Sequence, residues 1–132
     1  NGYVEESIMP RLFRESPLNA IWEGSGNVIA LDVTRAIARN PESLDTFLAE
    51  CGDAAAAPIR DLVDTALGDE ANARRLTESM ALAWAAQLMR RHTPNEVGDT
   101  YTRSRVDERH KSLFGTLPTD LPLRTIAARA VP

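Results

Sequence analysis

The sequence predicts an all-α fold, a helical bundle. Three observations favour it: Ala and Leu dominate the 132 residues, only 5% of them are aromatic, and no stretch of four or more residues alternates between apolar and polar as a strand does. Apolar residues make up 43% of the chain and charged residues 26%, which is the balance of an ordinary globular domain. We therefore expect one domain, large enough to have a real core.

Proline and glycine delimit the first helices. A short helix is expected over residues 5–14, ending before Ser16-Pro17, because the residue before a proline avoids the α region. Ser25-Gly26-Asn27 offers caps for a second helix that reaches Arg39. The residues of this second helix expected to point inward are Val28, Leu31 and Ala38.

The third and fourth helices carry clear apolar stripes. Asn40-Pro41 begins the third helix with a cap and a proline at the first helical position, and Gly52 closes it. The fourth helix ends at Gly68. The stripes are Leu44, Phe47, Leu48 and Cys51 on the third helix, and Ile59, Leu62, Val63, Ala66 and Leu67 on the fourth.

The longest helix is capped by Asp69 and reaches His92. Its segment 80–89 is apolar on nearly every side, which predicts that it lies at the centre of the bundle. Pro94 breaks it, and a last long helix is expected over residues 96–114. One face of that helix carries Val106, His110, Leu113 and Phe114. Residues 115–122 are expected to be extended, and residues 123–130 to add a final turn or two.

The cysteine and histidine content excludes several classes of site. A single cysteine, Cys51, rules out an internal disulfide framework and suits a reducing compartment, so we expect a cytoplasmic protein. His92 and His110 lie 18 residues apart on different expected helices, which does not suit a metal site. No secretory signal or membrane span is apparent. The chain begins "NGY", which we interpret as the middle of a longer protein.

The chain has a net charge of −4, but its charges are distributed unevenly along the sequence. Residues 1–69 carry 5 arginines against 12 acidic residues, and residues 70–132 carry 10 basic residues against 7 acidic ones. The basic clusters are Arg74-Arg75, Arg90-Arg91-His92, and Arg103, Arg105, Arg109 and Lys111. A solvated helix face laced with acidic residues is the simpler interpretation. The alternative is a surface for the phosphates of double-stranded DNA, formed by Arg90, Arg91, Arg103, Arg105 and Arg109.

Glu23 stands between an apolar pair, Ile21-Trp22, and the turn Gly24-Ser-Gly-Asn27. The pattern alone favours a carboxylate that interacts with the dipole of the following helix. The alternative is a base for proton abstraction, since a partly dry pocket beside Ile21 and Trp22 would raise the pKa of a carboxylate. A Gly-rich turn that leads into a helix can also present backbone N–H groups to an anion, although this signal is weak alone.

The order of motif residues in the first 35 positions resembles the C-terminal α-domain of the acyl-CoA dehydrogenase family. The matching residues are Gly2-Tyr3, Glu6, Pro10-Arg11, Phe13-Arg14-Glu15 and Trp22-Glu23-Gly24-Ser25. The form "WEGSGN", with the later "SRV" at 104–106, "FGTLP" at 114–118 and "IAARA" at 126–130, resembles the alkylation-response AidB-type branch. That branch is associated with DNA binding.

The resemblance implies roles for individual residues. Glu23 matches the base that removes the α-proton of an acyl-CoA thioester while the β-hydride passes to FAD. The residues matching FAD contacts are Gly2, Gly24, Ser25 and Asn27. In this interpretation residues 1–39 form the flavin and active-site segment, and residues 40–132 form a helical extension of AidB type.

The resemblance also implies what lies outside the chain. Residues 1–132 would be the C-terminal helical domain of a larger flavoprotein whose N-terminal helical domain and middle β-domain are absent here. Because most flavin and acyl-thioester contacts lie in those domains, we expect the chain alone to be inactive. The parent would use an acyl-CoA substrate and an electron acceptor. It would form a homo-oligomer, a tetramer by resemblance, and would not associate with a membrane.

Overall fold

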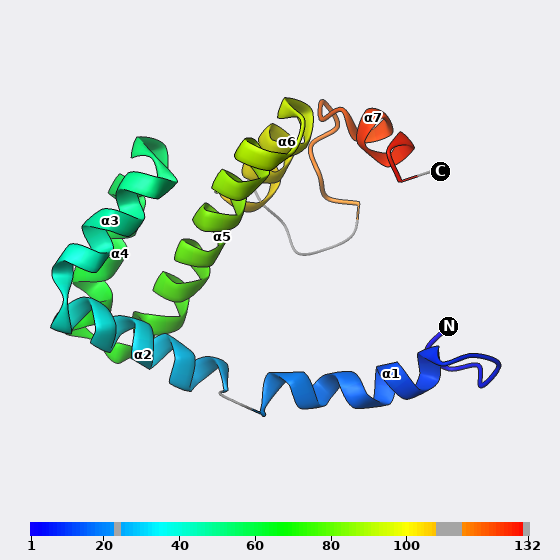
Figure 1. The fold of residues 1–132 in the computed structure, drawn as a ribbon, viewed down its shortest axis with the longest axis horizontal. Coiled ribbons are helices and arrows are strands. Elements are labelled where there is room, and N and C mark those ends of the chain that lie inside the picture. The colour runs from blue at the N-terminus through cyan, green and yellow to red at the C-terminus, as the bar shows by residue number, and fades with distance from the viewer. Residues whose placement is uncertain (23–24, 108–114, 131–132) are drawn as a thin grey trace.

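The computed structural model describes residues 1–22, 25–107 and 115–130, and within these ranges it contains helices and no β-strand. The predicted helical fold is confirmed (Figure 1). The elements are α1 (Met9–Glu15), the 3₁₀ helix η1 (Ser16–Ala20), α2 (Gly26–Arg39), α3 (Pro41–Cys51), α4 (Asp53–Gly68), the 3₁₀ helix η2 (Glu70–Asn72), α5 (Ala73–His92), α6 (Asn95–Arg105) and α7 (Leu123–Ala128).

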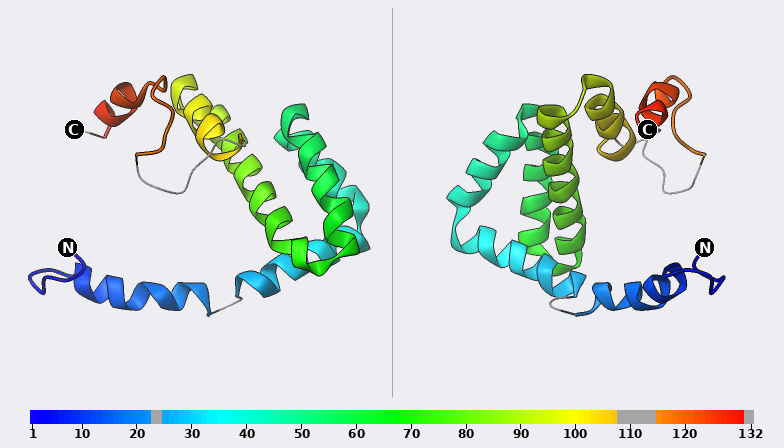
Figure 2. Two further views of the ribbon diagram at one scale, coloured as in Figure 1. Left: turned by 180° about the vertical axis from the view of Figure 1, so that it is seen from behind. Right: turned by 45° about the vertical axis from the view of Figure 1, so that its right-hand side comes forward.

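Helix α5 is the centre of the bundle, as its apolar sequence predicted. It packs against α2, α3, α4 and α6, and α3 also packs against α4. Figures 1 and 2 show α2 crossing near the first turns of α5, and α1 with η1 forming an arm that extends away from the bundle. The N-terminus lies at the far end of this arm (Figure 1).

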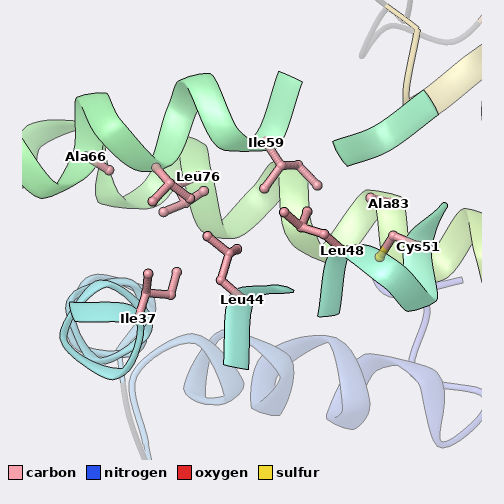
Figure 3. Close-up of a cluster of buried hydrophobic side chains, with 9 residues drawn as sticks. Ile37, Leu44, Leu48, Cys51, Ile59, Ala66, Leu76 and Ala83 are labelled. Atoms are coloured by element: carbon pink, nitrogen blue, oxygen red, sulfur yellow. The ribbon is translucent and has the colours of Figure 1, made fainter. Parts of the chain in front are cut away.

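The core lies where α2, α3, α4 and α5 meet (Figure 3). Leu76 of α5 is completely buried, and Leu48 of α3 and Ile59 of α4 are 2% exposed. The buried members of the cluster are Ile37, Leu44, Leu48, Cys51, Ile59, Val63, Ala66, Leu76 and Ala83. The apolar stripes predicted for α3 and α4 therefore face the core, except that Leu67 is 48% exposed.

Local signals account for the bounds of α3. Pro41 stands at its first position, where the missing N–H costs no hydrogen bond, and Gly52 follows its last residue with φ +86°. That positive φ favours glycine, because a Cβ is strained in this region. The bounds predicted for α3 are confirmed.

The first helix begins later than predicted. The expected range was 5–14, but α1 begins at Met9, with Pro10 in its first turn. A proline in the interior of a helix over 5–14 would remove a hydrogen bond and clash with the preceding turn, so the helix begins just before it. The helix ends at Glu15, directly before Ser16-Pro17 as expected, and the 3₁₀ helix η1 follows with Pro17 in its first turn.

The inward face of α2 differs from the prediction. Val28 is 50% exposed and Ala38 is exposed, and Leu31 is only half-buried. The buried residues are instead Ala30, Thr34 and Ile37. These residues lie one and two turns apart on the side of α2 that contacts α5 and the core, and the small Ala30 permits a close approach.

Two expectations for the later helices are also corrected. Trp84 and Leu88 of α5 are 36% and 37% exposed, so this central helix has an open side. Helix α6 ends at Arg105 rather than continuing through Asp107 toward residue 114, and Val106 after it is 37% exposed. His110, Leu113 and Phe114 lie outside the described residues. The short helix expected near the C-terminus is present as α7.

Candidate active site

The start of α2 carries two of the residues assigned to cofactor binding. Ser25 is the N-cap of α2, with extended backbone at φ −64° and ψ 150°, and its carbonyl accepts the N–H of Ile29 at 3.1 Å. Within the described residues, the Ser25 hydroxyl makes no capping hydrogen bond to the first turn. The hydroxyl and the first N–H groups of α2 are thus both available to a ligand.

Asn27 is held from a distant part of the chain. Its side-chain Oδ1 accepts a hydrogen bond from Nη1 of Arg74 at 3.1 Å, across 47 residues of sequence. The Arg74 guanidinium also lies beside Gly26, where an added Cβ would meet Nη2 at 3.6 Å and Cζ at 3.8 Å. Sequence reasoning missed Arg74, because no periodicity or motif links it to residues 25–27.

Two pockets meet at this point. One, of about 440 Å³, is lined by Asn19, Ala20, Ser25, Gly26, Asn27, Ile29 and Arg74. The other, of about 570 Å³, lies along α2 and the first turns of α5 and includes Arg75 and Glu78. Gly26, Ile29 and Arg74 line both pockets. The start of α2 therefore borders a concave surface with one arginine between its two parts.

The apolar residues before the turn are exposed in this chain. Ile21 is 69% exposed and Trp22 is 53% exposed, and the indole Nε1 of Trp22 donates to Oδ1 of Asn19 at 3.2 Å. Together with Val28, which is 50% exposed, these two residues leave apolar surface uncovered around the start of α2. The partly dry pocket predicted beside Ile21 and Trp22 is not formed by the described part of the chain.

The predicted site residues are only partly brought together. Ser25 and Asn27 lie together at the start of α2, whereas Gly2 lies beside α1. Gly2 packs against Phe13, whose Cγ would be 3.1 Å from an added Cβ. Glu23 and Gly24 lie outside the described residues.

Four of the five arginines predicted to bind DNA lie in the described part of the chain; all four are exposed, and three of them are paired. Arg91 contacts Glu50 at 2.8 Å, Arg103 contacts Asp120 at 2.7 Å, and Arg90 lies 3.9 Å from Asp99. Arg105 has no ion pair with another described residue, and Arg109 lies outside the described residues. The carboxylates reduce the net positive charge that this surface presents.

The described part of the chain contains neither a candidate metal site nor a candidate membrane span. Among residues 1–22, 25–107 and 115–130, no group of three or more His, Cys, Asp or Glu side chains could hold a metal ion. In the same part of the chain, no helix combines the length and the apolar character needed to span a bilayer. Cys51 is buried, as predicted, and lies among the core residues.

Comparison with known proteins identifies two similar sequences. The chain is 64% identical over 36 residues to AidB of Escherichia coli (strain K12), which is named as a candidate acyl-CoA dehydrogenase. It is 39% identical over 46 residues to acyl-CoA dehydrogenase family member 11 of Caenorhabditis elegans. The resemblance to acyl-CoA dehydrogenases of AidB type is thus present in the alignments as well as in the order of motif residues.

These similarities are confined to short stretches. The first covers 27% of this chain and 7% of AidB, and the second covers 35% of this chain and 8% of the nematode protein. No protein-family model matches the chain. The matched stretches therefore span less than a tenth of either relative.

Proposed function

We propose that this chain is the C-terminal helical part of an FAD-dependent acyl-CoA dehydrogenase-like oxidoreductase, with Glu23 as the base that removes the α-proton of an acyl-CoA thioester. The observation that carries the proposal is the 64% identity over 36 residues to AidB, named as a candidate acyl-CoA dehydrogenase. The order of motif residues from Gly2 to Ser25 supports it. The full-length protein in this proposal joins the chain to an N-terminal helical domain and a β-domain.

The groups at the start of α2 suit a flavin. The hydroxyl of Ser25 and the first N–H groups of α2 are donors, and a flavin dinucleotide presents ring carbonyls and phosphate oxygens as acceptors. A Ser at this position can also accept from a ring N–H, because a hydroxyl is both donor and acceptor. Gly2, which packs against Phe13, is assigned in this proposal to the adenine side of an FAD held by a neighbouring subunit.

In this reaction Glu23 acts as the general base. The thioester carbonyl makes the α-carbon of the substrate weakly acidic, and the carboxylate of Glu23 accepts the α-proton. The bound FAD supplies the acceptor for the β-hydride. A base for so weak an acid needs a pKa near neutrality, which exclusion of water provides by disfavouring the charged carboxylate.

Exclusion of water depends on the rest of the protein. Ile21 and Trp22 are more than half exposed in this chain, so the site becomes dry only when another domain or subunit covers them. The proposal therefore includes a homo-oligomer, expected to be a tetramer in the cytoplasm, and assigns no turnover to the 132 residues alone. The proposal also includes an electron acceptor that reoxidises the reduced flavin.

Exchanging Glu23 for Gln in the full-length protein tests the proposal. Glu23→Gln keeps the shape of the side chain and removes the proton acceptor, so reduction of the flavin by acyl-CoA should slow by about 10²–10⁴-fold. The FAD content should stay unchanged, because the proposed task of Glu23 is proton transfer. Stopped-flow absorbance of the flavin measures the rate, and the protein's spectrum measures the content.

Glu42 provides the matched control. It is a carboxylate in the first turn of α3, so Glu42→Gln removes a helix-start charge at a place with no assigned chemistry. We expect this variant to reduce its flavin at the parent's rate. If Glu23→Gln behaves like Glu42→Gln, Glu23 is a helix-start carboxylate and the proposed base is refuted.

A second candidate function is binding of double-stranded DNA. Arg90, Arg91, Arg103 and Arg105 are all exposed, which favours it. Their ion pairs are at the surface, where such pairs contribute only about 0.2–1 kcal/mol each, so DNA phosphates could displace the carboxylates. The two candidates rest on different residues and can be tested separately.

A further inference from the structure

Arg74 joins the start of α2 to the start of α5. Its Nη1 donates to Oδ1 of Asn27 at 3.1 Å, and its guanidinium lies beside Gly26. It is the second residue of α5 and lines both pockets that border the start of α2. A single side chain thus contacts the two residues that follow Ser25.

The backbone that carries Arg74 is firmly anchored. Ala73 and Leu76, on either side of it in α5, are 1% and 0% exposed, and Ala30, one turn after Gly26 in α2, is 1% exposed. The helices therefore pack closely just beneath the hydrogen bond. Because the guanidinium is planar and its donors have fixed directions, it can orient the Asn27 amide as well as attract it.

Helix dipoles do not account for this position. The N-terminus of a helix carries partial positive charge, so a cation there is unfavourable. Arg74 stands in the first turn of α5 and also contacts the first turn of α2. The specific contacts with Asn27 and Gly26 are therefore the interactions that favour the observed placement.

We propose that Arg74 is a positioning residue that fixes the start of α2 against α5 by holding Asn27, and so keeps the Ser25 hydroxyl and the first N–H groups of α2 in place for the flavin. The inference rests on the proposed function, in which Ser25 and Asn27 contact the bound FAD. Arg74 acts through Asn27 and touches neither the α-carbon nor the flavin ring in this proposal.

Whether Arg74 fixes the start of α2 can be tested without any turnover. Hydrogen exchange is followed at the amide of Ile29, whose N–H donates to Ser25 and reports on the first turn of α2. In full-length Arg74→Ala this amide should exchange about 2- to 10-fold faster, the factor expected for loss of one hydrogen bond. Arg75→Ala is the matched control, since Arg75 carries the same charge one residue later, and it should leave the exchange unchanged. Equal exchange rates at Ile29 in the parent, Arg74→Ala and Arg75→Ala would show that Arg74 does not fix the start of α2.

The role in catalysis is tested by a double-mutant cycle. The rate of flavin reduction at saturating acyl-CoA is measured in Arg74→Ala, Asn27→Ala and the double variant, with the unfolding midpoint of each as a check on folding. If Arg74 acts through Asn27, the double variant should be no slower than the slower single variant, each about 2- to 10-fold below the parent. Multiplying effects, or an unchanged rate in Arg74→Ala, would overturn the positioning role. A lower unfolding midpoint in Arg74→Ala with an unchanged rate of flavin reduction would also overturn the positioning role.

A failure of the proposed function has a different signature. If the full-length parent retains no FAD, or its flavin is not reduced by acyl-CoA, the dehydrogenase proposal fails and the catalytic role of Arg74 fails with it. Exchange at Ile29 still decides whether Arg74 fixes the start of α2. The two failures are therefore distinguishable in the same set of proteins.

Discussion

Cys51 is a small buried residue whose surroundings keep its thiol neutral. It is 9% exposed at the end of α3. Burial raises the pKa of the thiol, and the neighbouring Glu50 carboxylate raises it further, while the Arg91 guanidinium lowers it. Since Arg91 pairs with Glu50 at 2.8 Å, the two charges offset each other, and burial is the largest cause.

This raised pKa predicts a loss of stability at high pH. The unfolded thiol ionises near its ordinary pKa of about 8.5, while the folded thiol still holds its proton, so the unfolded state is favoured as pH rises through the window between the two values. The free energy of unfolding should fall by up to about 1.4 kcal/mol per pH unit more in the parent than in Cys51→Ala. Denaturant unfolding at several pH values from 7 to 10 measures this. Parallel curves for the two proteins would show that the thiol has the same pKa folded and unfolded.

At the scale of elements, Gly98 permits α6 to lie directly on α5. An added Cβ would be 3.0 Å from Cα of Arg90 and 3.2 Å from its backbone N, which is tighter than nine in ten real Cβ contacts. Because two of the three contacted atoms are backbone, a change of rotamer cannot relieve the overlap. The close crossing of these two helices thus depends on one missing methyl group.

Gly98→Ala should therefore destabilise the chain. Overpacking typically costs about 1–3 kcal/mol, and the better helix propensity of Ala offsets about 1 kcal/mol of this, so we expect a net loss of up to about 2 kcal/mol. Gly68→Ala is the control, because nothing lies within 4 Å of an added Cβ at the end of α4. It should be neutral or slightly stabilising. Urea unfolding compares the two, and equal midpoints would mean that α6 moves aside freely.

The elements also show what the sequence could predict. The bounds and inward stripe of α3 follow from Pro41, Gly52 and the apolar spacing, all of which are local. The buried face of α2 did not follow, because Ala30 and Thr34 are buried by the approach of α5 rather than by their own hydrophobicity.

In the candidate site, too, local sequence predicts some features and not others. The order of residues around Trp22 and Ser25 was sufficient to predict a family resemblance, and the alignments agree with it. The hydrogen bond from Arg74 to Asn27 spans 47 residues and depends on how α2 meets α5, so no local pattern could predict it. Glu23 stays a prediction from the sequence.

At the scale of the whole molecule, the distribution of charge predicts how any DNA binding responds to salt. If the exposed arginines of α5 and α6 bind phosphates, affinity should be independent of sequence, and its logarithm should fall with log salt by about 0.9 per phosphate contact. Arg105→Gln should then reduce this slope by about one contact, since Arg105 has no ion pair with a described residue. Arg60→Gln is the control, because Arg60 pairs with Asp45 between α3 and α4. A slope near zero, or no retention of duplex at low salt, would remove DNA binding as a function.

Residues 1–22, which include the arm formed by α1 and η1, carry many of the exposed large apolar side chains. Scattered apolar residues are normal on a protein surface, whereas a continuous patch favours association. Between residues 3 and 29, the described large apolar side chains that are exposed are Tyr3, Val4, Ile8, Met9, Leu12, Phe13, Leu18, Ile21, Trp22, Val28 and Ile29. Apart from Val28 and Ile29, which begin α2, they lie on the part of the chain that extends from the bundle (Figure 2).

We therefore expect the isolated 132-residue chain to form a helical dimer or a larger species. Covering the arm removes apolar surface from water, at about 25 cal/mol for each Å² buried, and Phe13, Ile21 and Trp22 are each more than half exposed. Replacing these three residues with Ser should shift sedimentation velocity profiles toward the monomer while the helical circular dichroism is retained. Leu67→Ser is the control, because Leu67 is 48% exposed but lies on α4, away from the arm. If the parent chain sediments as a monomer at every concentration tested, the arm does not drive association, and its apolar residues would need another explanation.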